Sequence, residues 1–345
     1  MTVVVKLGSS LVTDGNGRAR RALLAARAAD IAAIAAAGES ACVVSSGAIA
    51  LGTPLLGLER RPRSTPQLQA ASAAGQVKLQ LAWEAALRGE GLRTAQVLLS
   101  AGDLAERASY VNARNALRAL LKLGVIPVIN ENDATATDEI TFGDNDALAA
   151  QVAVLLGARL LVLLTEVDGV YSTHPAEPGA EPLASGDAVA GAAIGRGGKL
   201  GRGGMESKVA AARLAADAGI PTVIASGKGK GVVAAIAAGE KRGTRFAPAG
   251  ETPSAFRLWL RHAKPTAGTL VVDDGARDAL VRGGGSLLAV GVARCDGSFA
   301  AGDAVELVAL DGTALGKGIA GAGADELRGR PRGVEAVHRD RLVLY

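Results

Sequence analysis

The sequence predicts an α/β fold with a mainly parallel sheet, followed by a small and mostly β domain at the C-terminus. Up to residue 240, short β-rich runs alternate with Ala-rich helical segments. Because these runs are continuously apolar, they are typical of parallel strands that helices cover on both faces. After residue 265 the chain changes to short apolar runs separated by Gly and Asp turns. That pattern predicts a separate β-rich module.

The elements of the first domain follow from their patterning. The strands are apolar or β-branched runs that end in small or polar residues, and several helical segments stop at a glycine that can cap a C-terminus, such as Gly38 and Gly124. The predicted strands are Thr2–Lys6, Ala41–Ser46, Thr94–Leu99, Val125–Asn130, Leu160–Thr165 and Pro221–Ala225. The predicted helices are Arg18–Ala37, Pro66–Arg88, Asn112–Leu123, Asn145–Leu156, Met205–Ala218 and Gly231–Ala238.

The C-terminal module contains one predicted helix, Ala276–Arg282, between short strands. The predicted strands are Thr269–Val272, Leu287–Val292, Ala304–Val308, Gly318–Gly321 and Arg341–Leu344. We therefore expect a first domain at residues 1–247, a basic connector at 248–265 and a second domain at 266–345. The second domain has about eighty residues, which is a viable domain size.

The distribution of charge argues against nucleic acid as a partner. The net charge is +4, but residues 241–265 hold six Lys and Arg against one acidic residue. Residues 266–345 hold nine Lys and Arg against eleven Asp and Glu. Nucleic-acid binding favours a broad basic surface with aromatic side chains for stacking. Aromatic residues make up only 3% of this chain.

Composition also indicates the compartment. No apolar run is long enough to span a bilayer, and the N-terminus has no basic leader before its first apolar stretch. Cys42 and Cys295 are far apart, which predicts reduced structural thiols, and three scattered histidines do not suggest a protein-ligated metal site. We expect a cytoplasmic protein with no membrane contact.

Unusual polar and Gly-rich sequences follow the predicted strands. In open α/β sheets, ligands bind beyond the carboxyl ends of the strands. The sequences at such positions are Lys6-Leu7-Gly8-Ser9-Ser10, Ser45-Ser46-Gly47-Ala48, Asn130-Glu131-Asn132-Asp133, Gly143-Asp144-Asn145-Asp146, Thr165-Glu166 and Gly201-Arg202-Gly203-Gly204-Met205-Glu206-Ser207-Lys208.

These residue types fit phosphoryl transfer. Glycines let backbone N–H groups approach phosphate oxygens, and helix N-termini add a favourable dipole. Lys6 and Lys208 both adjoin Gly-rich turns and could neutralise the moving phosphoryl group from two sides. A carboxylate acceptor is already ionised near neutral pH, so it needs no general base. Asp146 would then orient the two lysines and would not abstract a proton.

Each feature also has a purely structural interpretation. A lysine after a strand is usually solvated, Asp146 could simply be a favourable charge at a helix N-terminus, and Asn130–Asp133 could be an ordinary turn. The joint occurrence of these sequences at successive strand ends favours a site. The P-loop pattern Gly-x-x-x-x-Gly-Lys-Ser/Thr is missing from the sequence, so the chain does not belong to that class of nucleotide-binding protein.

Taken together, the motifs resemble those of the glutamate 5-kinase family. The resemblance rests on Lys6-Leu7-Gly8-Ser9, Ser46-Gly47-Ala48-Ile49, Asn130–Asp133, Gly143–Asp146 and Gly203-Gly204-Met205 with Ser207-Lys208, and it covers nearly the whole chain. The final module, with Asp273–Ala276 and Ala336–Asp340, resembles the PUA domain that many members carry. The resemblance implies the amino-acid kinase three-layer α/β/α sandwich and the first step of proline biosynthesis.

The resemblance also implies a role for each matching residue. Lys6 and Lys208 would contact the ATP phosphates and the transition state, and Asp146 would organise them. Ser46, Asp133 and Asn145 match glutamate-binding positions, with polar donors for its α-carboxylate and Asp133 for its ammonium. The nucleotide-binding positions, besides the two lysines, are Gly8, Thr165, Glu166, Arg202, Gly203, Gly204, Met205, Glu206 and Ser207. Magnesium would be held largely by the ATP phosphates.

Further implications concern partners and alternatives. Members of the family commonly form dimers or tetramers and are inhibited by proline. Their product is the substrate of a downstream glutamate-5-phosphate reductase. This sequence departs from the family at Arg202, where Thr is usual, and at Glu166, where Asp is frequent, so its nucleotide preference is less defined than its acceptor. Two alternatives stay open: a sister kinase acting on N-acetylglutamate, aspartate, carbamate or a nucleotide monophosphate, and an RNA-binding or RNA-modifying protein that uses the PUA-like module.

Overall fold

A computed structural model describes residues 1–135, 145–190, 204–248 and 254–345. The chain divides into two compact units, Met1–Thr252 and Pro253–Tyr345. This division falls within the range 248–265, which the sequence suggested as a connector. Each unit has its own sheet and its own buried apolar cluster.

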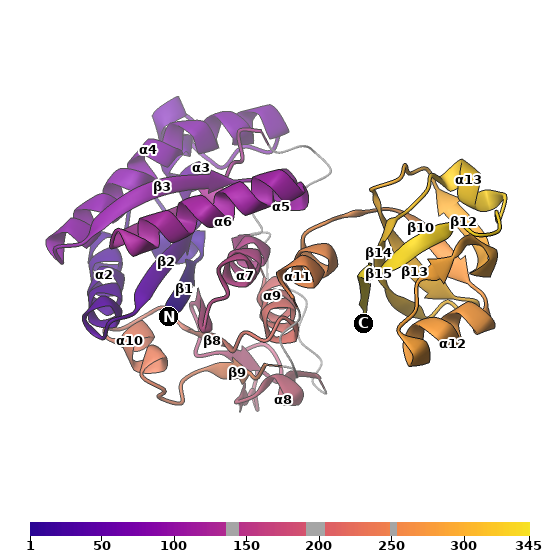
Figure 1. The fold of residues 1–345 in the computed structure, drawn as a ribbon. Helices are drawn as coiled ribbons and strands as arrows, with labels where there is room; N and C mark the ends of the chain where they lie inside the picture. Colours follow the sequence, from indigo (N-terminus) through magenta and orange to yellow (C-terminus); the bar gives the residue numbers. More distant parts are fainter. Residues whose placement is uncertain (136–144, 191–203, 249–253) are drawn as a thin grey trace. The chain divides into compact units, whose positions relative to one another are not determined.

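A mainly parallel sheet forms the centre of the first unit (Figure 1). Its strand order among the described residues is β3-β4-β2-β1-β5-β8-β9, and only the edge strand β9 pairs antiparallel, to β8. The strands are β1 Thr2–Leu7, β2 Ser40–Ser45, β3 Arg93–Leu99, β4 Val125–Glu131, β5 Leu160–Thr165, β8 Thr222–Ser226 and β9 Thr244–Phe246. The expected parallel α/β sheet is confirmed. The strand β9 was not predicted, because its three residues lie in a segment rich in basic residues.

Helices cover both faces of this sheet and complete three layers. On one face α2 (Arg21–Ala36), α4 (Thr65–Gly89) and α10 (Val232–Ala237) pack on the inward residues Val3, Val5 and Leu7 of β1. On the other face α6 (Arg107–Lys122), α7 (Asn145–Leu156) and α9 (Met205–Asp217) pack against one another and the sheet. Since strand side chains alternate, Val4 and Lys6 point to the α7 and α9 side.

Shorter elements connect these layers, and the structure corrects two helix starts. The short elements are α1 Ser9–Val12, α3 Ala48–Gly52, η1 Thr53–Leu56, α5 Ala101–Ala105, α8 Gly186–Ala190, β6 Val170–Tyr171 and β7 Pro182–Leu183. Helix α6 begins at Arg107, earlier than Asn112, because the Glu106 carboxylate accepts hydrogen bonds from the Ala108 and Ser109 amides. Helix α2 begins at Arg21 and not at Arg18.

The second unit is a mostly β domain. Its sheet has the order β11-β15-β14-β13-β10-β12 and encloses a core that includes Leu270, Leu307 and Val337. The strands are β10 Thr266–Val272, β11 Leu287–Leu288, β12 Val292–Gly297, β13 Ala304–Ala309, β14 Ala314–Ala320 and β15 Glu335–Leu344, and the helices are α11 Ala255–His262, α12 Asp274–Gly283, η2 Ala289–Gly291 and α13 Ala324–Arg328.

One strand predicted for the second unit was wrong. The predicted strand Leu287–Val292 is broken by the 3₁₀ turn η2, and its second part continues as β12. Helix α11 lies in the range suggested as a connector, and it contacts β14 and β15. The half-buried Lys317 ammonium of β14 donates to the Arg261 and Lys264 carbonyls at the end of this helix. These bonds satisfy carbonyls that a helix C-terminus leaves without partners.

Among the described residues, no helix is both long and apolar enough to cross a membrane.

Helices α3 and α4 approach so closely that glycine is required at their contact. A Cβ added to Gly75 would lie 1.8 Å from the Ala48 carbonyl oxygen, and one added to Gly52 would lie 1.8 Å from the Ala71 carbonyl oxygen. Both neighbours are backbone atoms, which cannot rotate away. This contact fixes the buried face of α4 against the segment that follows β2.

We therefore expect Gly75→Ala to destabilise the protein by about 3 kcal/mol, the upper range for overpacking. For a unit of this size the loss corresponds to a Tm lower by roughly 6–12 °C. The matched control is Gly89→Ala at the end of the same helix, where an added Cβ meets nothing within 4 Å. Thermal unfolding of both variants checks the prediction, and equal Tm values would contradict it.

Candidate active site

The predicted site residues lie where neighbouring parallel strands end. The strands β4, β2, β1, β5 and β8 are adjacent and run in the same direction, so their carboxyl ends share one edge of the sheet. Lys6 stands near the end of β1, Ser46 directly follows β2, Asn130 lies near the end of β4 and Thr165 ends β5. The topology therefore collects the polar strand ends that are separate in the sequence.

A buried carboxylate lies between two buried lysines at this edge. Asp146 Oδ1 is 2.5 Å from Lys6 Nζ, and Asp146 Oδ2 is 3.1 Å from Lys208 Nζ. The Ser207 hydroxyl donates to the same Oδ2 at 3.0 Å. Lys6, Asp146 and Lys208 are only 4%, 1% and 6% exposed. The structure thus brings together the two lysines and the aspartate that the sequence suggested as catalytic.

Local structure explains the convergence of these three side chains. Lys6 points to the α7 and α9 side because strand side chains alternate. Asp146 stands in the first turn of α7, and Lys208 stands in the first turn of α9, which begins after the extended residue Gly204. Two helix N-termini therefore point at the same place, and each contributes partial positive charge.

The electrostatics of the cluster favour an anion. Burial alone raises the pKa of the Asp146 carboxyl, but the ammonium groups of Lys6 and Lys208 outweigh burial and hold its pKa below the usual value. Asp146 is therefore ionised at neutral pH. Two positive charges then face one negative charge, and the surplus positive charge can neutralise a phosphate group.

A second polar group adjoins the lysine cluster. The Asn145 side-chain amide donates to Ser46 Oγ at 2.9 Å and to Asn130 Oδ1 at 2.9 Å. Both amide hydrogens are thereby used, and the buried Asn145 Oδ1 has no hydrogen-bond partner among the described residues. Because its neighbour in sequence is Asp146, Asn145 joins the two parts of the site.

Asp133 is a buried carboxylate with one oxygen available for a ligand. Its Oδ2 accepts a hydrogen bond of 2.6 Å from the Ser72 hydroxyl, whereas its Oδ1 is buried without a partner in the described part of the chain. Burial raises the pKa of Asp133, while the Ser72 hydrogen bond and the charge of Arg61 oppose this rise. An ammonium group would satisfy the unpartnered oxygen and compensate the buried charge.

Helix α4 supplies residues that the sequence analysis missed. Ser72 binds Asp133, Gln76 donates to the Glu131 carbonyl at 3.4 Å, and the Trp83 indole donates to Ser45 Oγ at 2.9 Å. The sequence contains a pattern that could have identified two of these residues. Ser72 and Gln76 are polar residues four apart on the apolar face of a helix, where polar side chains need buried partners.

The residues expected to bind nucleotide are placed in part. Thr165, Gly204, Met205 and Ser207 are half-buried, while Glu166 and Glu206 are exposed. Arg202 and Gly203 lie outside the described residues. A Cβ on Gly8 would lie 3.9 Å from Lys6 Nζ, so this glycine keeps the space beside the ammonium open.

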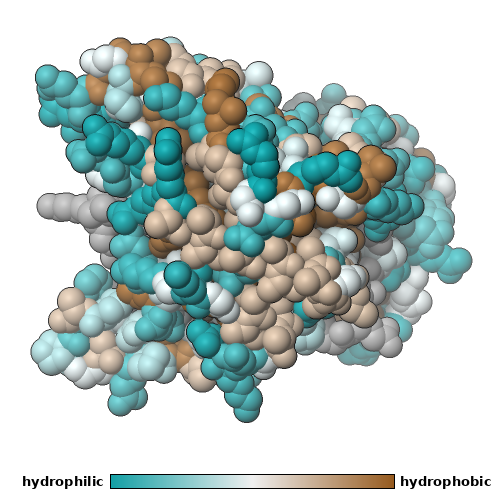
Figure 2. All heavy atoms as spheres, turned by 90° about the vertical axis from the view of Figure 1, so that its left-hand side faces the viewer, coloured by the Kyte–Doolittle hydropathy of each residue, from teal (hydrophilic) through white to brown (hydrophobic). Residues whose placement is uncertain are grey.

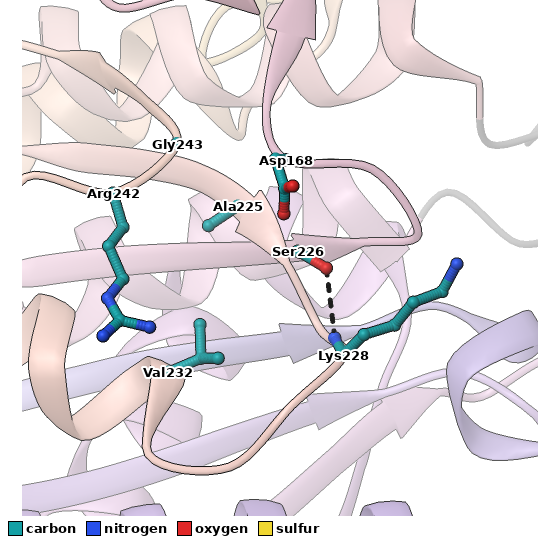
Figure 3. Close-up of a pocket in the computed structure, with 7 residues that line it drawn as sticks. All are labelled: Asp168, Ala225, Ser226, Lys228, Val232, Arg242 and Gly243. Carbon is teal, nitrogen blue, oxygen red and sulfur yellow. Dashed lines mark hydrogen bonds between the residues drawn. The ribbon is translucent and has the colours of Figure 1, made fainter. Parts of the chain in front are cut away.

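A pocket of about 300 Å³ lies at the carboxyl end of β8 (Figure 3). Its lining includes charged side chains of both signs, namely Asp168, Lys228 and Arg242, together with Ala225, Ser226, Val232 and Gly243. The Gly227 amide donates to the Thr165 carbonyl at 2.7 Å, which ties the pocket loop to the end of β5. This loop is absent from the residues predicted for the site, although Ser226-Gly227-Lys228-Gly229 repeats the strand-end pattern of small and charged residues.

Comparison with known proteins identifies the class. The model of the amino acid kinase family matches residues 1–226, and the PUA domain model matches residues 268–339. Because the first match spans more than half of the chain, the protein belongs to the amino acid kinase family.

Relatives that match nearly the full length place the chain more narrowly, with the glutamate 5-kinases. The glutamate 5-kinase of Pseudomonas fluorescens (strain Pf0-1) is 45% identical over 364 residues, covering 99% of this chain and 97% of the relative. That of Geobacter sulfurreducens is 41% identical over 361 residues, with 99% and 97% covered. That of Ralstonia nicotianae is 44% identical over 368 residues, with 99% and 96% covered.

A solved structure supports the fold independently. An isopentenyl phosphate kinase matches with a TM-score of 0.51 and 22% identity, covering 72% of this chain and all of that one. At this identity the match supports the kinase fold and says nothing of the substrate. The expected amino-acid kinase architecture with a C-terminal PUA domain is confirmed.

We expect Asp146→Asn to lower the free energy of unfolding by about 3–5 kcal/mol at pH 7, because two buried lysines lose their counterion. The native pKa of Asp146 is depressed, so its contribution is complete above the unfolded-state pKa and is lost as the pH falls through the native pKa. The difference from the unsubstituted protein should therefore be equal at pH 7 and pH 5. Urea unfolding at both pH values measures it.

The matched control for this variant is Glu84→Gln, which removes the exposed Glu84–Arg88 pair on α4. An exposed pair contributes only about 0–1 kcal/mol. If Asp146→Asn costs no more than this control, the buried cluster does not stabilise the fold.

Proposed function

We propose that the protein transfers the γ-phosphoryl group of ATP to the side-chain carboxylate of L-glutamate and forms L-glutamate 5-phosphate, the first step of proline biosynthesis. One observation carries this proposal: the Lys6–Asp146–Lys208 cluster adjoins Asn145, and Asn145 and Asp133 each hold a buried oxygen that has no hydrogen-bond partner among the described residues. The cluster suits a phosphoryl group and the oxygens suit an ammonium. The names of the near-full-length relatives agree with this substrate pair.

The hydrogen bonds refine how glutamate would bind. The unpartnered Asp133 Oδ1 and Asn145 Oδ1 are acceptors, so both suit the α-ammonium group. The Ser46 hydroxyl already accepts from Asn145, which leaves its own hydrogen to donate to the α-carboxylate. Asn145 therefore acts as an acceptor for the ammonium, and not as the carboxylate donor that the sequence suggested.

The chemical step follows from the placement of charge. An oxygen of the glutamate side-chain carboxylate forms a bond to the γ-phosphorus, the bond from that phosphorus to the β-phosphate oxygen breaks, and ADP leaves. No proton is transferred, because the attacking carboxylate is already ionised. Lys6 and Lys208 stabilise the charge on the moving group from two sides, and Asp146 holds both ammonium groups in position.

The nucleotide would extend from the lysine cluster toward the pocket beyond β8. The Gly8 turn and the α9 N-terminus suit its phosphates, and the pocket with Asp168, Ser226 and Lys228 suits its nucleoside. The hydrogen bond from the Gly227 amide to the Thr165 carbonyl links the loop that lines this pocket to the end of β5. These assignments extend the nucleotide site beyond the residues suggested by sequence.

Magnesium fits this site as a companion of the ATP phosphates. Outside the undescribed segments, no three Asp, Glu, His or Cys side chains gather as ligands, and Asp146 is already paired with two lysines. When bound, the ion would neutralise phosphate charge. The chain's own residues would contact it only through the nucleotide.

The decisive experiment supplies L-glutamate, ATP and magnesium with hydroxylamine, which converts an acyl phosphate to a hydroxamate. We expect glutamyl hydroxamate only when glutamate and ATP are both present. Equal turnover with N-acetylglutamate or aspartate, or no hydroxamate from folded protein, would refute the proposal.

The variant Lys208→Ala should stay folded and lose about 10²–10³-fold in kcat, which is the effect of removing one hydrogen-bond donor to the transition state.

Asp133→Asn should raise the KM for glutamate roughly 10- to 100-fold, the equivalent of about 1.5–3 kcal/mol for a hydrogen bond to a charged group. The KM for ATP should stay unchanged.

The KM for glutamate should also depend on pH. Because burial raises the pKa of Asp133, the KM for glutamate should rise as the pH falls toward that pKa. Ser72→Ala removes a hydrogen bond that lowers the pKa of Asp133, so in this variant the rise should begin at a higher pH. Identical pH profiles of the unsubstituted protein and Ser72→Ala would contradict the role of Asp133 in binding glutamate.

We also propose that the protein forms a homo-oligomer, and a surface of α4 suits such an assembly. Helix α4 exposes an apolar stripe made of Ala70, Ala73, Val77 and Leu81, and Val77 is 64% and Leu81 55% exposed. Figure 2 shows hydrophobic residues among hydrophilic ones on one face of the molecule, most of them in its upper half. We expect Leu81→Asp to lower the association state in sedimentation equilibrium. An unchanged mass would rule out this stripe.

Two regulatory implications of the family stay predictions. Inhibition by proline is tested by adding proline to the hydroxamate assay. The second is transfer of the product to a reductase, which is chemically reasonable because an acyl phosphate hydrolyses readily.

A further inference from the structure

A charged pair is completely buried where α2 packs beside α10 and the loop that follows β8. Arg27 is 0% and Asp30 is 2% exposed, and both lie on α2 among core residues such as Leu24 and Ile31. Their charges are 3.1 Å apart, between Arg27 Nε and Asp30 Oδ2. Charged side chains are almost never fully buried unless they are paired, and an apolar pair of similar size would often stabilise a core equally well.

The partners of this pair suggest its purpose. The Arg27 guanidinium donates to the Gly229 carbonyl, and to the Gly227 carbonyl at 3.4 Å. The Asp30 carboxylate accepts from the Val233 amide at 3.4 Å, in the first turn of α10. A carboxylate at this position is also favoured by the dipole of α10. The pair therefore holds both sides of one turn, about 200 residues away in the sequence.

The turn that the pair holds carries one wall of the pocket beyond β8. Ser226, Lys228 and Val232 line the pocket, and Lys228 lies between the two glycines whose carbonyls Arg27 binds. Gly229 and Gly231 adopt φ values of +86° and +72°, so the segment depends on glycine conformations that few other residues share. Glycine-rich segments lose much conformational entropy on ordering. A buried guanidinium that fixes two of their carbonyls supplies this order in advance.

We propose that Arg27 and Asp30 are positioning residues for nucleotide binding. They hold the segment 226–232 in the conformation in which Ser226 and Lys228 face the nucleoside part of ATP. This role rests on the proposed function for the identity of the ligand. Neither residue contacts the nucleotide, since both side chains are buried behind the pocket wall.

The test uses the double variant Arg27→Met/Asp30→Leu in the full chain, because it leaves no unpaired buried charge. We expect its affinity for ADP, measured by calorimetry, to fall about tenfold, which is the size of the ordering cost that a preorganised segment avoids. The KM for ATP should rise by the same factor. The KM for glutamate, and kcat at saturating ATP, should stay within about twofold.

The matched control is Arg88→Gln/Glu84→Gln, which removes the exposed pair on α4 and should leave every constant unchanged. The single variant Arg27→Lys, which can reach one carbonyl but not both, should show an intermediate affinity. A folded double variant with unchanged ADP affinity, or an equal rise in both KM values, would overturn the positioning role.

A second measurement compares hydrogen exchange in the absence of nucleotide. Residues 227–234 should exchange more slowly in the unsubstituted protein than in the double variant, because the buried pair orders this segment before the nucleotide binds. Equal exchange in the two folded proteins would overturn the proposal. Binding of ADP without kinase activity toward glutamate would contradict the proposed function alone and leave the positioning role supported.

Discussion

The site depends on one constraint: a single buried carboxylate must hold two buried lysines close together. Asp146 meets this constraint because its side chain lies between β1, which brings Lys6, and α9, which brings Lys208. Without the carboxylate the two ammonium groups would repel each other in a region of low dielectric constant. With it, the cluster keeps one surplus positive charge. The same arrangement therefore stabilises the fold and favours phosphate.

The layers of the first unit have different tasks around this cluster. Helices α7 and α9 bring the charged residues, whereas α4 on the opposite face supplies Ser72, which binds the buried Asp133. Helix α4 can approach this closely because Gly75 and Gly52 leave no side chain in the contact with α3. Packing of two helices thus sets the acceptor part of the site, although neither glycine contacts a ligand.

The fold was largely predictable from the sequence. The parallel strands are continuously apolar because both of their faces are covered, and this pattern is visible in residues such as Leu160–Thr165 without any tertiary information. Elements that depend on distant partners were missed. Strand β9 pairs with β8 and, through Arg245, with Ser185, and α11 is ordered through contacts with β14 and β15. Their local sequences carry little signal because their stability comes from those contacts.

The fold class, the family and the candidate residues at strand ends could be predicted from the sequence, because glycine, lysine and aspartate in short patterns have local physical meaning. Which of these residues meet became visible only in the folded chain. The tertiary structure placed Asp146 between two lysines and showed that the amide hydrogens of Asn145 are used. It also revealed Arg27, whose partners lie about 200 residues away. A helical arginine carries no local sign of its partner, because that contact arises only when α2 packs beside the β8 loop.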